Sequence, residues 1–352
     1  MDADDVGEVH RSRLGGVPPP GMHPVRWHTG ASRSVASTKG MSTMNLTPEA
    51  AALLERWIQA AGGIAPALAG EGGLSWAEVR DNYGKELAAA LPAPHGVTFE
   101  RTELDGVPTM LVVPEDVTDD RTLLYLHGGG YVHGAVEGYV GLTGHYAKRL
   151  RARVLVPDYR QAPEHPFPTP IDDVFTAYRA LLAAGTAPEK IAISGDSAGG
   201  AMVITVMRKA RDAGLPLPVA GVSLSPWADL THSGSSVQSR TGLDPLTSGE
   251  FLEKLARTFL GNALPTDPDA SPVFADVRGL APTLIQMGEN EVMLSSGITL
   301  AGRLAEQRVR TTLEVWPHMF HVWHLLAGHM AEADEALDNA VSFITREYER
   351  AR

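Results

Sequence analysis

Short apolar segments alternate with longer amphipathic segments along most of the chain. The apolar segments have the length of buried strands, and we expect strands at residues 97–101, 109–113, 123–126, 154–156, 191–193, 219–224, 283–286 and 313–315. Apolar positions at helical spacing predict helices at residues 138–150, 171–183, 198–213 and 296–306, and a last helix with the stripe Leu337, Val341, Ile344 and Tyr348. This alternation is typical of the α/β class, with a mostly parallel central sheet and helices on both faces.

Two regions depart from this alternation. Residues 45–95 precede most of the sheet and contain two expected helices. The first helix begins at Thr47-Pro48-Glu49, which has the order of an N-cap, an N1 proline and a first-turn carboxylate. Residues 228–272 are rich in Pro, Asp and Ser and contain one expected helix at 248–260. We expect this second region to be an insertion over one end of the sheet.

The first 44 residues show no hydrophobic period. They contain Pro18-Pro19-Pro20, and every charged residue between Val9 and Thr43 is basic. Such a stretch buries too little apolar surface to offset chain entropy, so we expect residues 1–44 to be a disordered leader. Two alternatives stay open: a transit peptide, and a leader upstream of a start at Met41 or Met44.

Composition and charge narrow the range of functions. The chain has 352 residues, 43% of them hydrophobic, which is enough for a sizeable core, and a net charge of −12. The acidic balance argues against nucleic acid or an anionic membrane as the main partner, and no apolar run has the length of a membrane helix. The absence of cysteine excludes disulfides, thiolate metal sites and a thiol nucleophile. We expect a cytoplasmic protein.

The strongest chemical signal is Gly195-Asp196-Ser197-Ala198-Gly199-Gly200, which lies between an expected strand and an expected helix. A G-x-S-x-G motif in that context predicts a nucleophile elbow, a strained turn that presents the hydroxyl of Ser197 at the edge of the sheet. Small residues flank the serine because strand and helix crowd each other at such a turn. The alternative is a purely structural turn.

A second signal is His127-Gly128-Gly129-Gly130-Tyr131, directly after an expected strand. Three consecutive glycines are unfavourable in entropy, but they allow main-chain N–H groups to approach a reacting oxygen. We therefore expect an oxyanion hole made by Gly128, Gly129 and Gly130 together with the amide of Ala198, the residue after the serine. Taken alone, the run is also compatible with a flexible turn.

With a third motif, the chain resembles a known family. Asp158-Tyr159-Arg160-Gln161-Ala162-Pro163-Glu164-His165-Pro166-Phe167-Pro168 is similar to the D-Y-R-L-A-P-E-x-x-F-P segment of the bacterial hormone-sensitive-lipase-like esterases, with Gln161 where Leu is usual. The resemblance covers residues 45 to 350 and implies the α/β-hydrolase fold. It implies a discontinuous cap of residues 45–95 and 228–272, and a catalytic domain of residues 96–227 and 273–352. The segment 158–168 is expected to support the site without a catalytic role.

The resemblance also implies the partners of Ser197. The pattern x-M-x-H-[GV]-[FW] places the catalytic imidazole at His321, and leaves His318 and His324 as loop or rim residues. The acid corresponds to Glu291, where most relatives have Asp, with Glu289 as the alternative; Asp244 lies too early in the chain and is expected in a turn. The spacing of His318, His321, His324 and His329 also allows a metal site, but no acidic ligand pair accompanies it, and we expect no metal.

These residues together predict a serine carboxylesterase that hydrolyses short- to medium-chain esters through an acyl-enzyme, with a small-molecule ester as partner and no cofactor. The family resemblance also implies a homodimer. Two alternatives stay open: a ligand-binding receptor of the same fold, and a longer-chain lipase. Five apolar residues either line the acyl pocket or form the core of the cap, and we expect the core for any one of them. They are Met44, at the end of the leader, and Trp57, Trp76, Phe251 and Leu255, in the cap.

Overall fold

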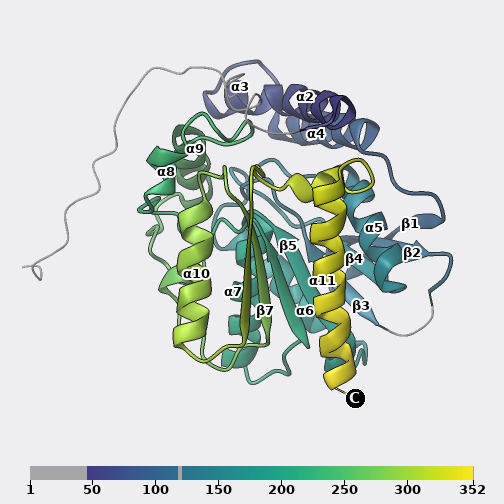
Figure 1. Ribbon diagram of the computed structural model, residues 1–352. Helices are drawn as coiled ribbons and strands as arrows, with labels where there is room; N and C mark the ends of the chain where they lie inside the picture. Colours follow the sequence, from purple (N-terminus) through teal and green to yellow (C-terminus); the bar gives the residue numbers. More distant parts are fainter. Residues whose placement is uncertain (1–45, 118–120, 352) are drawn as a thin grey trace, which may run out of the picture. The chain divides into compact units, whose positions relative to one another are not determined.

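The computed structural model describes residues 46–117 and 121–351 (Figure 1). The predicted leader, residues 1–44, therefore lies outside the described residues. The predicted α/β class is confirmed. Among the described residues, no helix combines the length and the apolar character needed to cross a membrane.

An eight-stranded sheet forms the centre of the structure, in the order β1-β2-β4-β3-β5-β6-β7-β8. The strands are β1 (Val97–Leu104), β2 (Val107–Pro114), β3 (Thr122–Leu126), β4 (Arg153–Pro157), β5 (Ile191–Asp196), β6 (Ala220–Leu224), β7 (Thr283–Gly288) and β8 (Thr311–Trp316). The first two pair antiparallel, as do β2 and β4, and all other pairs are parallel. After β4 the chain crosses to the other side of β3, so the strand order reverses between β3 and β5. Such a reversal is where open α/β sheets bind ligands, at the carboxyl ends of the strands.

Helices cover both faces of the sheet. One face packs against α5 (Val140–Leu150) and α11 (Ala331–Arg350), the other against α6 (Thr169–Ala183), α7 (Ala198–Asp212) and α10 (Leu294–Glu306). Within β3, Leu123 and Tyr125 belong to the first core, while Leu124 and Leu126 belong to the second. Because successive side chains of a strand point to opposite faces, this fully apolar strand supports two cores at once.

The remaining helices lie over the carboxyl ends of the strands (Figure 1). From the N-terminal region come α2 (Pro48–Ala60), α3 (Ile64–Leu68) and α4 (Trp76–Ala90), and from the insertion come α8 (Ser236–Ser239) and α9 (Gly249–Leu260). The predicted cap of α2 is observed, since Thr47 accepts a hydrogen bond from the Ala50 amide. Short 3₁₀ turns complete the fold. They are η1 (Ala61–Gly63), η2 (Val136–Tyr139), η3 (Pro188–Lys190), η4 (Pro272–Phe274) and η5 (Trp323–Leu326).

The observed elements differ from the predicted ones mainly at their ends. The helix predicted from residue 138 starts as the 3₁₀ turn η2 and becomes α-helical only at Val140. The hairpin strands β1 and β2 extend further toward their turn than predicted, because every residue up to the Leu104–Val107 pair is in register. These differences leave the predicted order of strands and helices unchanged.

Candidate active site

Ser197 lies in a strained turn between β5 and α7. Its backbone has φ 54° and ψ −119°, a conformation that a non-glycine residue adopts only when its surroundings hold it. The surroundings are tight: a Cβ on Gly199 would lie 1.9 Å from the Leu126 carbonyl oxygen, and a Cβ on Gly195 would lie 2.6 Å from the Gly199 carbonyl oxygen. The glycines of the motif are therefore required by close backbone approach, as the sequence predicts.

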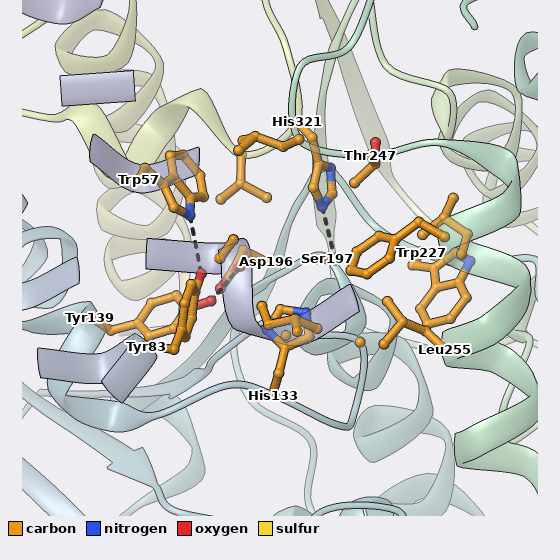
Figure 2. Close-up of a pocket in the computed structure, with 18 residues that line it drawn as sticks. Trp57, Tyr83, His133, Tyr139, Asp196, Ser197, Trp227, Thr247, Leu255 and His321 are labelled. Atoms are coloured by element: carbon orange, nitrogen blue, oxygen red, sulfur yellow. Dashed lines mark hydrogen bonds between the residues drawn. The ribbon is translucent and has the colours of Figure 1, made fainter. Parts of the chain in front are cut away.

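The side chains of Ser197, His321 and Glu291 form one continuous chain of hydrogen bonds. Ser197 Oγ lies 3.0 Å from His321 Nε2, and His321 Nδ1 lies 3.0 Å from Glu291 Oε2 (the first contact is drawn in Figure 2). The serine follows β5, the glutamate follows β7 and the histidine follows β8. Parallel strands bring their carboxyl ends to one edge of the sheet, so three residues far apart in sequence meet there.

Glu291 is fully buried and held by two further hydrogen bonds. Its Oε1 accepts from the Ser225 hydroxyl at 2.8 Å and from the Gly288 amide at 2.5 Å. Ser225 Oγ also accepts from the Val322 amide at 3.1 Å, so this one hydroxyl links the acid to the loop that carries His321. The sequence analysis missed Ser225; its only signal is its place directly after β6, at the same edge of the sheet as the other site residues.

Burial and mutual charge set the protonation of this pair. Burial raises the pKa of Glu291, and the hydrogen bonds from His321 and from the Gly288 amide oppose that rise. Burial works to lower the pKa of His321, but its hydrogen bond with Glu291 and the charges of Glu291, Asp244 and Asp196 outweigh burial and raise the pKa above its ordinary value. The imidazole is therefore a stronger base than an isolated histidine.

The alternative acids lie elsewhere. Glu289 Oε2 accepts from the His318 amide at 3.0 Å, and both side chains are largely exposed. Asp244 is in a turn, as predicted: its carboxylate accepts from the amides of Leu246 and Thr247 and from the Thr247 hydroxyl. It is nevertheless buried and close enough to act on the charge of His321.

His324 corrects one prediction. It is not a rim residue but fully buried, with Nε2 3.1 Å from Gln286 Oε1, and burial lowers its pKa to about 3. The pattern of neighbouring histidines gives no information on burial, because a short 3₁₀ turn after the loop carries this side chain inward. The part of the chain that the structure describes contains no group of three or more His, Cys, Asp or Glu side chains arranged for a metal ion.

The glycine run lies in residues 127–134, here called the glycine loop, which follows β3. The structure corrects the role predicted for Gly128, because its N–H donates to Asp196 Oδ1 at 2.9 Å and is not available to a reacting oxygen. Within the described ranges, no partner takes up the N–H groups of Gly129, Gly130 and Ala198. Gly129 and Gly130 both have positive φ and line the same cavity as Ser197.

Asp196 is a second group that the sequence analysis missed. Its buried carboxylate accepts from the hydroxyls of Tyr125 (2.8 Å) and Tyr139 (3.1 Å) as well as from the Gly128 amide. Burial raises its pKa to about 6, and these three hydrogen bonds oppose the rise. The residue before the nucleophile therefore anchors the start of the glycine loop.

The segment 158–168 supports the glycine loop from another side, as the resemblance implies. The Tyr159 hydroxyl donates to the His127 carbonyl at 2.8 Å, and its ring stacks on His127. The Ala162 amide donates to the Tyr131 carbonyl at 2.9 Å. Gln161, where the resembling family has Leu, donates from Nε2 to the Gly134 carbonyl at 2.7 Å.

Ser197 lines a cavity beside His321. Most of its lining is apolar or aromatic and comes from α2, α3, α4, α9 and the strand ends, with Trp57, Ile64, Tyr83, Trp227, Leu246, Phe251, Leu252 and Leu255 (Figure 2). Trp57, Phe251 and Leu255 line the cavity, and Trp57 and Leu255 are at the same time buried in the core, as expected. Trp76 is not part of this lining, and Met44 lies outside the described residues.

Comparison with known proteins places this site in a family. The family described as the alpha/beta hydrolase fold matches residues 123–325. An acetyl-hydrolase of Streptomyces hygroscopicus is 39% identical over 226 residues, which are 64% of this chain and 76% of that protein. An ethyl acetate hydrolase of Pseudomonas putida is 32% identical over 224 residues, 61% of this chain and 70% of that protein. The crystal structure of an esterase from the bacterial hormone-sensitive lipase family aligns with a TM-score of 0.79 at 36% identity, over 87% of this chain and all of that one.

Proposed function

This chain belongs to the hormone-sensitive-lipase-like esterases of the α/β-hydrolase fold and is a carboxylesterase, and from that premise we propose that it hydrolyses short- to medium-chain esters with a triad of Ser197, His321 and Glu291. The observation that carries the proposal is the unbroken chain of hydrogen bonds from the Ser197 hydroxyl through the imidazole to the buried Glu291 carboxylate.

In the first step, Ser197 Oγ attacks the ester carbonyl carbon. Glu291 accepts the hydrogen bond of His321 Nδ1–H, which keeps the lone pair of Nε2 directed at the serine hydroxyl. His321 takes the serine proton as the new C–O bond forms, and the carboxylate stabilises the resulting imidazolium. His321 then gives this proton to the leaving alcohol oxygen, and an acyl-enzyme remains on Ser197.

The negative charge that develops on the carbonyl oxygen is stabilised by the N–H groups of Gly129, Gly130 and Ala198. A donor of this kind lowers the barrier by roughly 3–4 kcal/mol, because it is already in place when the charge appears. In the second step, water loses a proton to His321 and attacks the acyl carbon, and the same donors hold the same oxygen. The bond between the acyl carbon and Ser197 Oγ then breaks, His321 returns the proton to Oγ, and the carboxylic acid leaves. These steps need no cofactor.

The helices over the strand ends form the cap that shapes the substrate site. The apolar lining from α2, α3, α4 and α9 suits an acyl chain or an apolar alcohol. The names of two relatives, an acetyl-hydrolase and an ethyl acetate hydrolase, support a preference for short acyl groups.

The direct test is hydrolysis of p-nitrophenyl esters by the wild type and by Ser197→Ala. We expect turnover of the acetate and butyrate by the wild type and a loss on the order of 10⁵-fold or more in kcat for Ser197→Ala, since the nucleophile itself is removed. Wild-type turnover that persists in Ser197→Ala would overturn the proposal. A matched series from acetate to palmitate tests the acyl preference, and a higher kcat/KM for palmitate than for butyrate would favour a long-chain lipase instead.

A further inference from the structure

Arg80, on helix α4, reaches out of the N-terminal helices and binds the glycine loop. Its Nε donates to the Val132 carbonyl at 2.8 Å, and its Nη2 donates to the Ala162 carbonyl at 2.7 Å. The side chain is only 17% exposed. A guanidinium suits this task because its donors have a fixed planar arrangement and satisfy two carbonyls at once.

These two hydrogen bonds close a ring around the loop. The amide of Ala162, whose carbonyl binds Arg80, donates to the carbonyl of Tyr131, the residue before Val132. Arg80 therefore fixes the distance between the glycine loop and the segment 158–168 at the point where they already touch. Among the described hydrogen bonds, no other side chain donates to both the Val132 carbonyl and the Ala162 carbonyl.

The loop needs such restraint because its backbone is unfavourable. Gly129, Gly130 and Tyr131 have φ values of 110°, 59° and 62°, so three successive residues are left-handed, and the third is not a glycine. The turn is closed locally by the amides of Val132 and His133, which both donate to the Gly129 carbonyl. A left-handed non-glycine residue persists when surrounding contacts hold it in place.

Arg80 is itself held firmly. Ser75 and Glu78 form a capping box that defines the start of α4. Glu164 binds the guanidinium through both carboxylate oxygens, at 3.0 and 2.7 Å, and the Trp76 ring lies 5.8 Å from its central carbon. A further contact of α4 comes from Tyr83, whose ring meets His133 edge-on in Figure 2. The helix thus presents the guanidinium to the loop in one geometry.

We propose that Arg80 is a positioning residue for the oxyanion hole: by holding the Val132 carbonyl against the segment 158–168, it fixes the direction of the N–H groups of Gly129 and Gly130. This inference rests on the proposed function, and it couples a helix of the cap to the transition state of acyl transfer. Arg80 does not line the cavity, so its effect on the reaction is transmitted through the loop.

The test compares Arg80→Met with Arg149→Met. Arg149, on α5, is similarly buried at 22% exposure and binds Asp334, Asp338 and His145. None of its described hydrogen bonds reaches the glycine loop or the segment 158–168, so it controls for the loss of a buried, paired arginine. For Arg80→Met we expect kcat with p-nitrophenyl butyrate to fall roughly 10- to 100-fold with KM changed less than about threefold, because the lost interaction matters mainly in the transition state. For Arg149→Met we expect unchanged kcat.

Butyl trifluoromethyl ketone supplies a second readout. It forms a hemiketal with the serine, whose oxyanion uses the same N–H donors, so its inhibition constant should rise in Arg80→Met by the factor by which kcat/KM falls. The inference is overturned if Arg80→Met lowers only the thermal midpoint, as Arg149→Met does, while kcat and the inhibition constant stay at wild-type values. The proposed function has its own test in Ser197→Ala, so the two failures are distinguishable.

Discussion

The triad and the glycine loop serve the same carbonyl group, but different parts of the molecule hold them. Glu291 and His321 are fixed by atoms at the ends of neighbouring strands: the Gly288 amide, the Ser225 hydroxyl and, through it, the Val322 amide. The glycine loop is held partly by Asp196, at the end of the neighbouring strand β5, and partly by Arg80, on helix α4 outside the sheet. The described hydrogen bonds of the triad therefore come from strand ends and the loops that follow them, whereas our proposal for the oxyanion hole also involves an N-terminal helix.

The two parts of the site should therefore respond to different substitutions. A change in the cap should leave the triad distances intact and still slow the reaction through the loop. A change at a strand end should disable the base without moving the loop. Variants that change only the triad or only the glycine loop should therefore separate the contributions of the two to the rate.

The largest expected effect in this comparison is on the triad side, for Glu291→Gln. The amide cannot stabilise the imidazolium and favours the wrong tautomer of His321, so we expect kcat to fall by a factor of about 10³–10⁴ with little change in KM. Steady-state kinetics with p-nitrophenyl butyrate measures both constants.

Glu289→Gln is the matched control for the acid. Among the described residues, the Glu289 carboxylate contacts the His318 backbone and side chain, away from Ser197, so kcat of this variant should stay near the wild-type value. The assignment of Glu291 is wrong if Glu289→Gln shows the large loss of kcat and Glu291→Gln keeps a kcat near the wild-type value.

An intermediate effect is expected on the loop side, for Gly129→Ala. A Cβ at this position would lie 2.3 Å from the Gly134 amide nitrogen, a backbone atom that cannot move aside without the loop. We expect kcat to fall by roughly 10²–10³-fold, comparable to the loss of one oxyanion donor. The variant should keep an intact triad, visible as an unchanged acidic limb in its pH–rate profile.

Gly185→Ala controls for backbone strain alone. Gly185 also has a positive φ, of 86°, but a Cβ there meets no atom within 4 Å. It should lose some thermal stability and keep its kcat. Equal losses of kcat in the two variants would contradict the role assigned to the loop.

The smallest expected effect is a shift of pH dependence in Asp244→Asn. His321 must be neutral to accept the serine proton, so its pKa sets the acidic limb of kcat/KM. The charge of Asp244 helps to raise that pKa, and its removal should lower the pKa and move the acidic limb to lower pH. Asp229→Asn is the control, since Asp229 is buried in a similar turn, bound to Thr231 and Ser233, and should leave the limb in place.

The observed geometry agrees with the sequence more closely at Ser197, Glu291 and His321 than at the glycine loop, for a physical reason. The turn at Ser197 is a local motif between one strand and one helix, so this residue could be inferred from its neighbours, whereas Glu291 and His321 came from the family resemblance. The Gly128 amide was assigned wrongly because its direction depends on Asp196, which is distant along the chain yet adjacent in the sheet. Arg80 and Ser225 carry no motif at all, since their roles exist only through tertiary contacts with carbonyls and carboxylates.

The sequence also did not predict which individual side chains are buried in the core and which line the cavity. His324 looks like its neighbours His318 and His321 in a histidine-rich loop, but the 3₁₀ turn that follows carries it into the core. Trp57 and Leu255 look like ordinary core residues of their helices, and they line the cavity because α2 and α9 lie over the strand ends. Helical periodicity identifies an apolar face without identifying what that face meets.

The most direct test of the central claim is to trap the acyl-enzyme. Wild type and Ser197→Ala are mixed with p-nitrophenyl butyrate, quenched in acid within the first turnover and analysed by peptide mass spectrometry. We expect one butyryl group on Ser197 of the wild type and no modification of Ser197→Ala. Turnover by the wild type with no butyryl group on Ser197, or with the group on another residue, would contradict this expectation.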